Sequence, residues 1–167
     1  REWMPTNPEK SCALLGEIIG GSQSTLAEIR RIVYALRPPA LDDLGLLSAI
    51  HEQARKFSSS DLNIVVTAPE SLPNLPAAVE VATYRIVQEA LMNVTRHAKA
   101  HSCSVSLSIN GHMEIAIEDD GVGIPSAYHA GVGLKSIYER VGELGGSCRI
   151  ESHPGMGTQI RVSLPRR

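Results

Sequence analysis

Alternating hydrophobic and polar positions predict a β-hairpin in the second half of the chain. Apolar side chains occupy every second position in residues 103–109 and 113–117, and the first run alternates with four serines, at 102, 104, 106 and 108. This period of two is typical of strands with one buried face, and Asn110-Gly111 predicts a two-residue turn. Because the serine-rich face should stay wet, helices should cover only one side of the sheet. The pattern predicts a two-layer α/β sandwich and disfavours a Rossmann-type parallel sheet.

A heptad pattern predicts a long N-terminal helix. Between Pro8 and Arg37, apolar residues recur in alternating steps of four and three, with one polar step at Ser22. A seam this long and narrow is compatible with packing on the chain's own domain and with a helical hairpin or dimer bundle. We slightly favour the bundle.

Two prolines predict an elbow after this helix. Each residue of Pro38-Pro39 lacks an amide donor and restricts the residue before it. Asp42 or Asp43 can cap a shorter connecting helix. The boundary therefore falls within residues 38–60, and the α/β domain should span residues 61–167.

A third helix is predicted between about Ala77 and Ala98, with an apolar arc toward the sheet and a polar stripe at its edge. Steps of three and four place the stripe on neighbouring turns, and its members are Glu89, Asn93, Arg96 and His97. A carboxylate, an amide and two nitrogen bases could serve a metal ion and a phosphate chain. Taken alone, the helix is better explained by a solvated edge with an ordinary ion pair between Glu and Arg.

Asp119 is the main candidate for recognising a polar ligand. It continues the buried phase of the preceding strand, and a carboxylate on the core side is costly unless a group donates to it. Gly121 and Gly123 follow at alternate positions, where positive φ lets the backbone approach a flat group. Thr158 shares the buried phase of the last strand, so its hydroxyl should face the same space as Asp119. In isolation, Asp-Asp-Gly is better explained as a surface turn, because Asp and Gly are the usual turn residues.

Residues 125–130 have few apolar anchors and lead into Gly131-Val132-Gly133, which begins another helix. Free amides and the positive end of a helix dipole favour phosphate at such a position. We expect a mobile lid beside a phosphate site.

Composition narrows the class of protein. A chain of 167 residues, 43% of them hydrophobic, suffices for one α/β domain with an appendage. The net charge is −2 without a long basic run, which argues against nucleic acid and against membrane contact by this fragment. Cys12, Cys103 and Cys148 form no Cys-x-x-Cys pair, so neither a disulfide framework nor a zinc site is expected, and a reducing cytoplasm fits. No apolar run approaches the roughly 20 residues that span a bilayer.

Four segments, in order, resemble the nucleotide-binding boxes of the ATPase superfamily shared by gyrase, Hsp90, MutL and sensor histidine kinases. They are Glu-Ala-Leu-Met-Asn-Val-Thr-Arg-His at 89–97, Asp-Asp-Gly-Val-Gly at 119–123, Gly-Val-Gly-Leu at 131–134 and Gly-Met-Gly-Thr at 155–158. Upstream, residues 36–46 resemble the end of the dimerisation helix in histidine kinases that work with LuxR-type response regulators. The resemblance implies a Bergerat-type ATP-binding fold, with a mixed sheet covered by helices on one face, preceded by a long dimerisation helix in residues 1–37.

The resemblance implies ATP and Mg²⁺ as ligands. Asp119 would accept from the adenine amino group and be joined through water to Thr158. Gly121 and Gly123 would give the ring its room, with Ile124 beside them.

At the phosphate end, the resemblance implies that Asn93 holds Mg²⁺ and that Arg96 and His97 contact the phosphates. Glu89 has two possible roles: it activates water in the hydrolysing members, and it helps to order the metal in kinases. The residues that would border the lid over the triphosphate are Gly131, Gly133 and Leu134.

The phosphoacceptor is the main departure from the family pattern. No Arg-Glu-Leu-His-Asp-like stretch is present, and the chain reads as a fragment that begins after it. His51-Glu52 is only superficially similar, because it lies beyond the proline elbow. We therefore expect ATP binding without self-phosphorylation. A smaller departure is Ser136-Ile137, where Gly and Met are usual.

The function expected is the catalytic domain of a cytoplasmic sensor histidine kinase, whose parent protein can be membrane-anchored. Its expected partners are a second copy of the kinase and a LuxR-type response regulator. Three alternatives stay open: a gyrase- or MutL-like ATPase using Glu89, a non-catalytic dimerisation module and an anti-sigma serine kinase.

Overall fold

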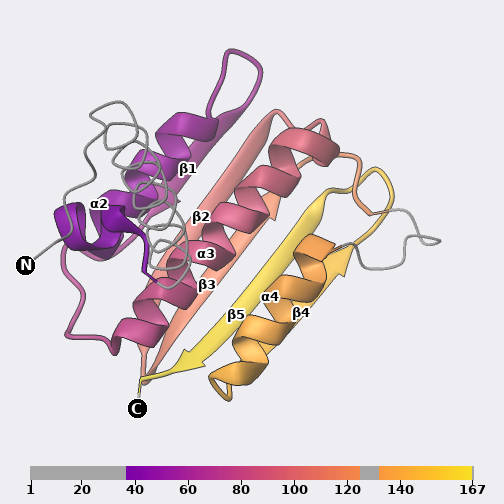
Figure 1. Ribbon diagram of the computed structural model, residues 1–167. Helices are drawn as coiled ribbons and strands as arrows, with labels where there is room; N and C mark the ends of the chain where they lie inside the picture. The colour runs from indigo at the N-terminus through magenta and orange to yellow at the C-terminus, as the bar shows by residue number, and fades with distance from the viewer. Residues whose placement is uncertain (1–36, 125–131, 167) are drawn as a thin grey trace, which may run out of the picture. The chain divides into compact units, whose positions relative to one another are not determined.

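The computed structural model describes residues 37–124 and 132–166 (Figure 1). The predicted N-terminal helix, the predicted lid and Gly131 lie outside these residues. The chain divides into two compact units, residues 1–39 and 40–167. The described elements are α2 (Pro39–Phe57), β1 (Asn63–Thr67), α3 (Ala77–Asn93), the π-helix η1 (Val94–Ala98), β2 (Ser102–Asn110), β3 (His112–Asp119), α4 (Val132–Glu143), β4 (Ser147–Ser152) and β5 (Thr158–Pro165).

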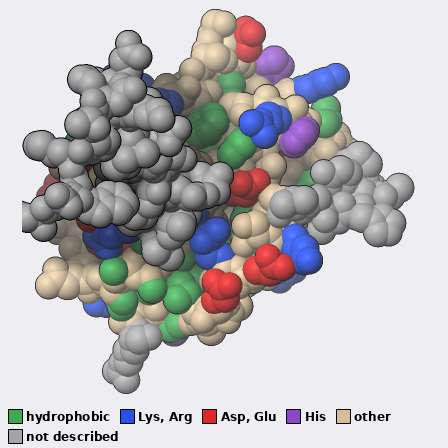
Figure 2. Space-filling model, in the orientation of Figure 1, with side chains coloured by type: hydrophobic (Ala, Val, Ile, Leu, Met, Phe, Trp, Pro, Cys, Tyr) green, Lys and Arg blue, Asp and Glu red, His purple; other side chains and the backbone are tan. Residues whose placement is uncertain are grey.

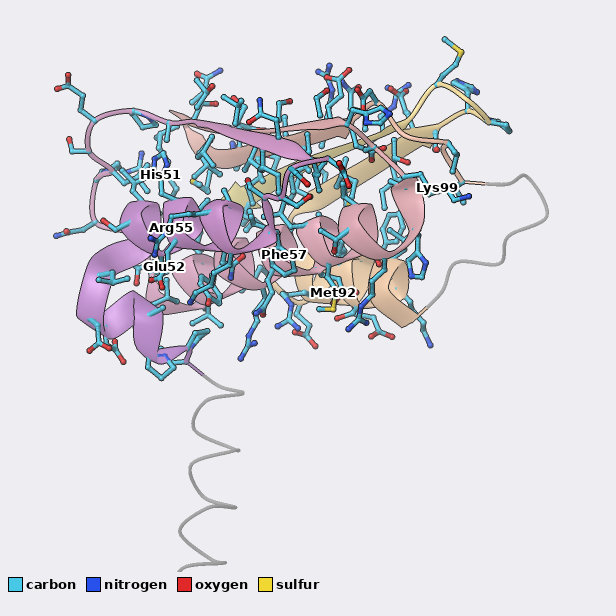
Figure 3. The ribbon with its side chains drawn as sticks, turned by 90° about the horizontal axis from the view of Figure 1, so that it is seen from above. His51, Glu52, Arg55, Phe57, Met92 and Lys99 are labelled. Carbon is cyan, nitrogen blue, oxygen red and sulfur yellow. The ribbon has the colours of Figure 1, made fainter. Side chains whose placement is uncertain are left out.

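The strands form one mixed sheet in the order β1-β2-β3-β5-β4. Strand β1 pairs with β2 in parallel, whereas the pairs β2–β3, β3–β5 and β4–β5 are antiparallel. Helices α3 and α4 cover one face of the sheet (Figures 1 and 3). The predicted two-layer α/β architecture is confirmed.

The β2–β3 hairpin follows the predicted alternation. Cys103, Val105 and Leu107 are buried, while the serines between them are exposed. The turn differs from the predicted two-residue form, because Asn110 pairs with His112 and leaves only Gly111, at φ 75°, between the strands. The wet serine face leaves the helical side as the place for a site.

Helix α2 belongs to the same core as the sheet. Its Leu46 and Ile50 are buried in the cluster that also contains the strands' apolar residues. It begins at Pro39, earlier than the predicted caps at Asp42 and Asp43, and it is broken at Gly45 (φ 73°, ψ 168°). A backbone with these angles is accessible chiefly to glycine. The segment predicted as a connecting helix therefore packs as part of the α/β unit.

The helix predicted for residues 77–98 is present, but its last turn is a π-helix. The predicted apolar arc is buried, from Val79 through Ala90 to Ala98. Thr95 Oγ1 donates to the carbonyl oxygens of Leu91 and Met92, at 3.1 and 3.0 Å. Because a π-helix bonds residue i to i+5 and so holds more residues per turn than an α-helix, the side chains after residue 93 are rotated from the positions that an α-helix predicts.

Candidate functional site

A cavity of about 290 Å³ lies between the sheet and the end of α3. Its walls come from α3, η1, β3, β5, α4 and the loop after β3, and most of them are apolar. The described residues that line it are Ala90, Asn93, Val94, His97, Ala98, Ile117, Asp119, Val122, Gly123, Ile124, Leu134, Thr158 and Ile160. The cavity thus brings together residues from each of the four segments that resemble nucleotide-binding boxes.

Asp119 lies at the cavity wall with 8% of its surface exposed. Its Oδ1 accepts a hydrogen bond from the Gly121 amide at 2.9 Å, and its residue pairs with Thr158 across β3 and β5. Burial raises the pKa of Asp119, and this effect is opposed by the backbone amides of Gly121 and Thr158. The predicted inward orientation is confirmed, and the carboxylate keeps acceptor capacity for a donor in the cavity.

Its neighbour Asp120 has a different environment. Asp120 Oδ1 accepts from the amides of His101 and Ser102 at 2.8 and 2.9 Å, and Oδ2 accepts from Ser102 Oγ at 3.0 Å. The bonds from Ser102 and His101 lower the pKa of Asp120. Asp120 therefore fixes the start of β2, and of these two carboxylates Asp119 is the one that lines the cavity.

The glycines of this loop allow backbone segments to meet. A Cβ at Gly121 would overlap the Ala98 carbonyl oxygen, and a Cβ at Gly123 (φ 70°) would overlap the His153 carbonyl oxygen. A Cβ at Gly157 (φ 78°) would overlap the carbonyl oxygen of Asp119. The close approach expected at Gly121 and Gly123 is thus made to protein backbone, and their contact with a bound ring stays a prediction.

The π-helix aims a backbone acceptor at the same loop. The Val122 amide donates to the Ala98 carbonyl oxygen at 2.7 Å. Lys99, the next residue, adopts left-handed angles (φ 51°) and ends the helix. The loop after β3 is therefore fixed to the end of α3, which closes one side of the cavity.

The predicted polar stripe is only partly brought together. Asn93 and His97 line the cavity, whereas Arg96 is exposed and Glu89 is half-buried outside the lining. The carboxylate of Glu89 and Nδ2 of Asn93 both lie against Gly133, where a Cβ would overlap Glu89 Oε1 and come within 3.3 Å of Asn93 Nδ2. The stripe assumed an α-helix, and the π turn after residue 93 explains why Arg96 does not follow Asn93 into the cavity.

Glu89 and Asn93 each carry a side-chain oxygen, which is the type of ligand that Mg²⁺ prefers. Mg²⁺ usually takes one or two protein oxygens and completes its shell with phosphate and water. Asn93 Nδ2 is buried and has no hydrogen-bond partner among the described residues. Because Nδ2 is a donor, only Oδ1 of this side chain could bind a metal. Within residues 37–124 and 132–166, no group of three or more His, Cys, Asp and Glu is arranged to hold a metal by itself.

Sequence reasoning missed Ser152, which bonds to two parts of the cavity wall. Its Oγ accepts from the Ile124 amide at 2.8 Å and lies 3.1 Å from Thr158 Oγ1. The signal available in the sequence was a pair of hydroxyl residues, at 152 and 158, flanking a glycine-containing turn. Their register as facing strand ends was needed to recognise it.

His51 lies far from this cavity. Figure 3 shows His51, Glu52 and Arg55 on α2, at the opposite end of the unit from Lys99, which follows the cavity-lining end of η1. Glu52 forms an ion pair with Lys56 at 2.8 Å. The unit's own cavity is therefore out of reach of His51, in agreement with setting His51-Glu52 aside as an acceptor.

Residues 78–167, more than half of the chain, match the family described as histidine kinase-, DNA gyrase B-, and HSP90-like ATPase. The signal transduction histidine-protein kinase/phosphatase DegS of Brevibacillus brevis is 35% identical over 147 residues, which are 86% of this chain and 38% of the relative. UhpB of Salmonella typhimurium, also a histidine-protein kinase/phosphatase, is 35% identical over 83% of this chain and 28% of its own length. The chain thus spans well under half of these curated relatives.

Solved structures share the fold at lower identity. The histidine kinase domain of the blue-light activated histidine kinase of Erythrobacter litoralis superposes with a TM-score of 0.61 at 23% identity, covering 73% of this chain and 59% of that one. The mycobacterial sensor histidine kinase MprB gives a TM-score of 0.54 at 24% identity, covering 72% of this chain and 94% of that one.

None of the helices in the described part is long and apolar enough to cross a bilayer. The chain belongs to the histidine kinase-, DNA gyrase B-, and HSP90-like ATPase family.

Proposed function

We propose that this unit binds ATP with Mg²⁺ in the cavity and serves as the catalytic domain of a sensor histidine kinase. The observation that carries the proposal is Asp119, a buried carboxylate with spare acceptor capacity at the wall of an apolar cavity that also holds Asn93. An aminopurine offers an apolar ring for the walls and an amino group for the carboxylate. The family match and the two curated relatives point to the same ligand class.

Different residues of the site would bind different parts of ATP. Apolar side chains such as Ile117 and Ile160 pack against the ring, and Asp119 accepts from its amino group. Asn93 and Glu89 supply the oxygens for Mg²⁺, which would neutralise phosphate charge when bound. His97 lines the cavity and Arg96 is exposed beside it, so both can approach phosphates. Positioning and charge compensation are the main protein contributions to phosphoryl transfer.

The finer proposal concerns the acceptor and the partners. The γ-phosphoryl would pass to a histidine on a dimerisation helix of a kinase dimer, and from there to a LuxR-type response regulator, in the cytoplasm. The likeness to DegS and UhpB supports this. His51 lies in the same unit but far from the cavity, which supports an acceptor other than His51. Incubation of this chain alone with γ-labelled ATP should leave it unlabelled. Covalent label on any of its histidines, recognised by its loss in acid, would refute the proposal that the acceptor lies elsewhere.

Titration of the chain with ATP and Mg²⁺ tests the proposal. Wild type should bind, and Asp119→Asn should weaken binding by roughly 10- to 100-fold, because a charge-assisted acceptor is replaced by an amide that presents a donor. Asp120→Asn is the matched control, since Asp120 bonds only to backbone and Ser102. Its ATP affinity should stay near wild type wherever the variant remains folded. A wild-type chain that binds no ATP, or an Asp119→Asn chain that binds normally, would overturn the proposal.

A second candidate function is steady ATP hydrolysis, which the position of Glu89 against Gly133 favours. The Glu89 carboxylate comes from α3 and lies against Gly133 at the start of α4, where it could activate water as well as order a metal. Hydrolysis at a steady rate that disappears in Glu89→Gln, with ATP binding retained, would support the ATPase. Loss of Mg²⁺-dependent affinity in the same variant would instead support the metal role.

A further inference from the structure

We infer that Ser152 is a positioning residue for recognition of the nucleobase, acting through Thr158 and Ile124. This inference rests on the proposed function. Ser152 is half-buried and is not among the residues that line the cavity. Its Oγ lies within hydrogen-bond distance of three partners: the Ile124 amide at 2.8 Å, the Gly157 carbonyl oxygen at 2.9 Å and Thr158 Oγ1 at 3.1 Å.

The valences of the serine hydroxyl fix the direction of these bonds. A hydroxyl has one proton and two lone pairs. The Ile124 amide can only donate, so it occupies one lone pair, and the Gly157 carbonyl can only accept, so it takes the proton. Thr158 must then donate its own proton to the second lone pair of Ser152. Ser152 is fully satisfied, and Thr158 keeps only acceptor capacity.

The surrounding backbone holds this arrangement in place. Ser152 and Thr158 are the facing residues that close the β4–β5 pairing. The turn between them is tied to the loop after β3, because the Gly155 amide donates to the Val122 carbonyl oxygen at 2.7 Å. Ser152 therefore connects two cavity-lining segments, one at Ile124 and one at Thr158, through a single atom.

This arrangement predicts how the site discriminates between bases. Two side chains near the base would both be acceptors: the Asp119 carboxylate, and Thr158 with its proton engaged by Ser152. Adenine presents an amino group to them, whereas hypoxanthine presents a carbonyl oxygen that finds no donor. Removal of the Ser152 hydroxyl frees the Thr158 proton, which can then be donated to that oxygen, directly or through water. Ser152 is thus expected to sharpen the preference for ATP over inosine triphosphate.

The test compares ATP and inosine triphosphate affinities, with Mg²⁺, for wild type and three variants. Ser152→Ala should lose about five- to tenfold in ATP affinity, and its preference for ATP over inosine triphosphate should fall by a similar factor. Ser152→Thr keeps the hydroxyl and suits a strand, so it should restore both. Ser147→Ala makes the same change at an exposed position at the other end of β4 and should behave as wild type.

A second measurement needs no ligand. Hydrogen exchange at the Ile124 amide should be faster in Ser152→Ala than in wild type and Ser152→Thr, because its acceptor is lost. Unchanged exchange and unchanged nucleotide preference in Ser152→Ala would overturn the inference. So would an equal loss of affinity for both nucleotides, which indicates a merely structural role, or failure of Ser152→Thr to restore the preference. A wild-type chain that binds neither nucleotide would overturn the proposed function and this inference with it, whereas normal wild-type binding beside an unaffected variant overturns the inference alone.

Discussion

The Val122 amide donates to the Ala98 carbonyl oxygen at 2.7 Å, which joins the loop after β3 to the π-helical end of α3. Residues 24 positions apart thereby form one corner of the cavity. The contact requires Gly121 beside it, because any Cβ there would overlap the same carbonyl oxygen.

Gly121→Ala should therefore destabilise the protein by about 1–3 kcal/mol through overpacking, and also weaken ATP binding by displacing Asp119. Gly142→Ala is the control, since Gly142 lies in α4 with no atom within 4 Å of the Cβ position. It should be neutral or stabilise by up to about 1 kcal/mol. Urea unfolding of both variants measures the difference, and equal free energies of unfolding would contradict the contact.

Gly157 and Gly155 form a second matched pair, because both have φ 78°. A Cβ at Gly157 would overlap the Asp119 carbonyl oxygen, whereas nothing lies within 4 Å of that position at Gly155. Gly155→Ala should cost about 1–2 kcal/mol from the left-handed backbone alone. Gly157→Ala should cost about 1–3 kcal/mol more. Similar thermal unfolding curves for the two variants would show that the overlap is relieved at no cost.

The raised pKa of Asp119 predicts a pH-dependent stability. Burial raises this pKa above the unfolded value, so Asp119 lowers stability as the pH rises from the unfolded pKa to the folded-state pKa, and the loss is complete above the latter. Asp119→Asn should therefore stabilise the ligand-free protein at about pH 7, and the gain should shrink at about pH 4, where Asp119 is increasingly protonated in both states. Thermal melting of both proteins at the two pH values measures this. A gain that does not depend on pH would point to a cause other than ionisation.

Cys103 should resist thiol reagents in the folded protein. It is 3% exposed, and burial, with smaller contributions from Asp119 and Asp120, raises the pKa of its thiol to about 12. Reactivity requires the thiolate. Labelling at about pH 8, followed by peptide mass spectrometry, should modify Cys103 only after unfolding. Rapid labelling under native conditions would show that β2 opens locally.

The side of the sheet on which each residue lies could be predicted from sequence. A period of two fixes sidedness along a strand, so the burial of Asp119 and the phase of Thr158 followed from their neighbours. The apolar arc of α3 followed in the same way from a period of 3.6. These predictions depend only on local repetition, which the sequence contains directly.

The contacts between distant segments could not be predicted in this way. The π turn at Val94–Ala98 changes the period inside one helix, so it placed Arg96 outside the cavity despite its spacing from Asn93. The bonds of Ser152 depend on the pairing of β4 with β5 and on the course of the loop to Ile124. Figure 2 shows acidic and basic side chains interspersed over the described residues of the face drawn, so no patch of one charge marks a site there.

The π-helix has a consequence for the length of this segment. Asn93 at its start faces the cavity, and the Ala98 carbonyl at its end holds Val122. Five residues of a π turn cover about the same angle as four residues of an α turn, so deleting one residue between them would convert the π turn to an α turn and leave the later groups facing nearly the same way. This segment should therefore absorb the loss of one residue better than the α-helical part of α3, where the same deletion would rotate every later side chain by about 100°.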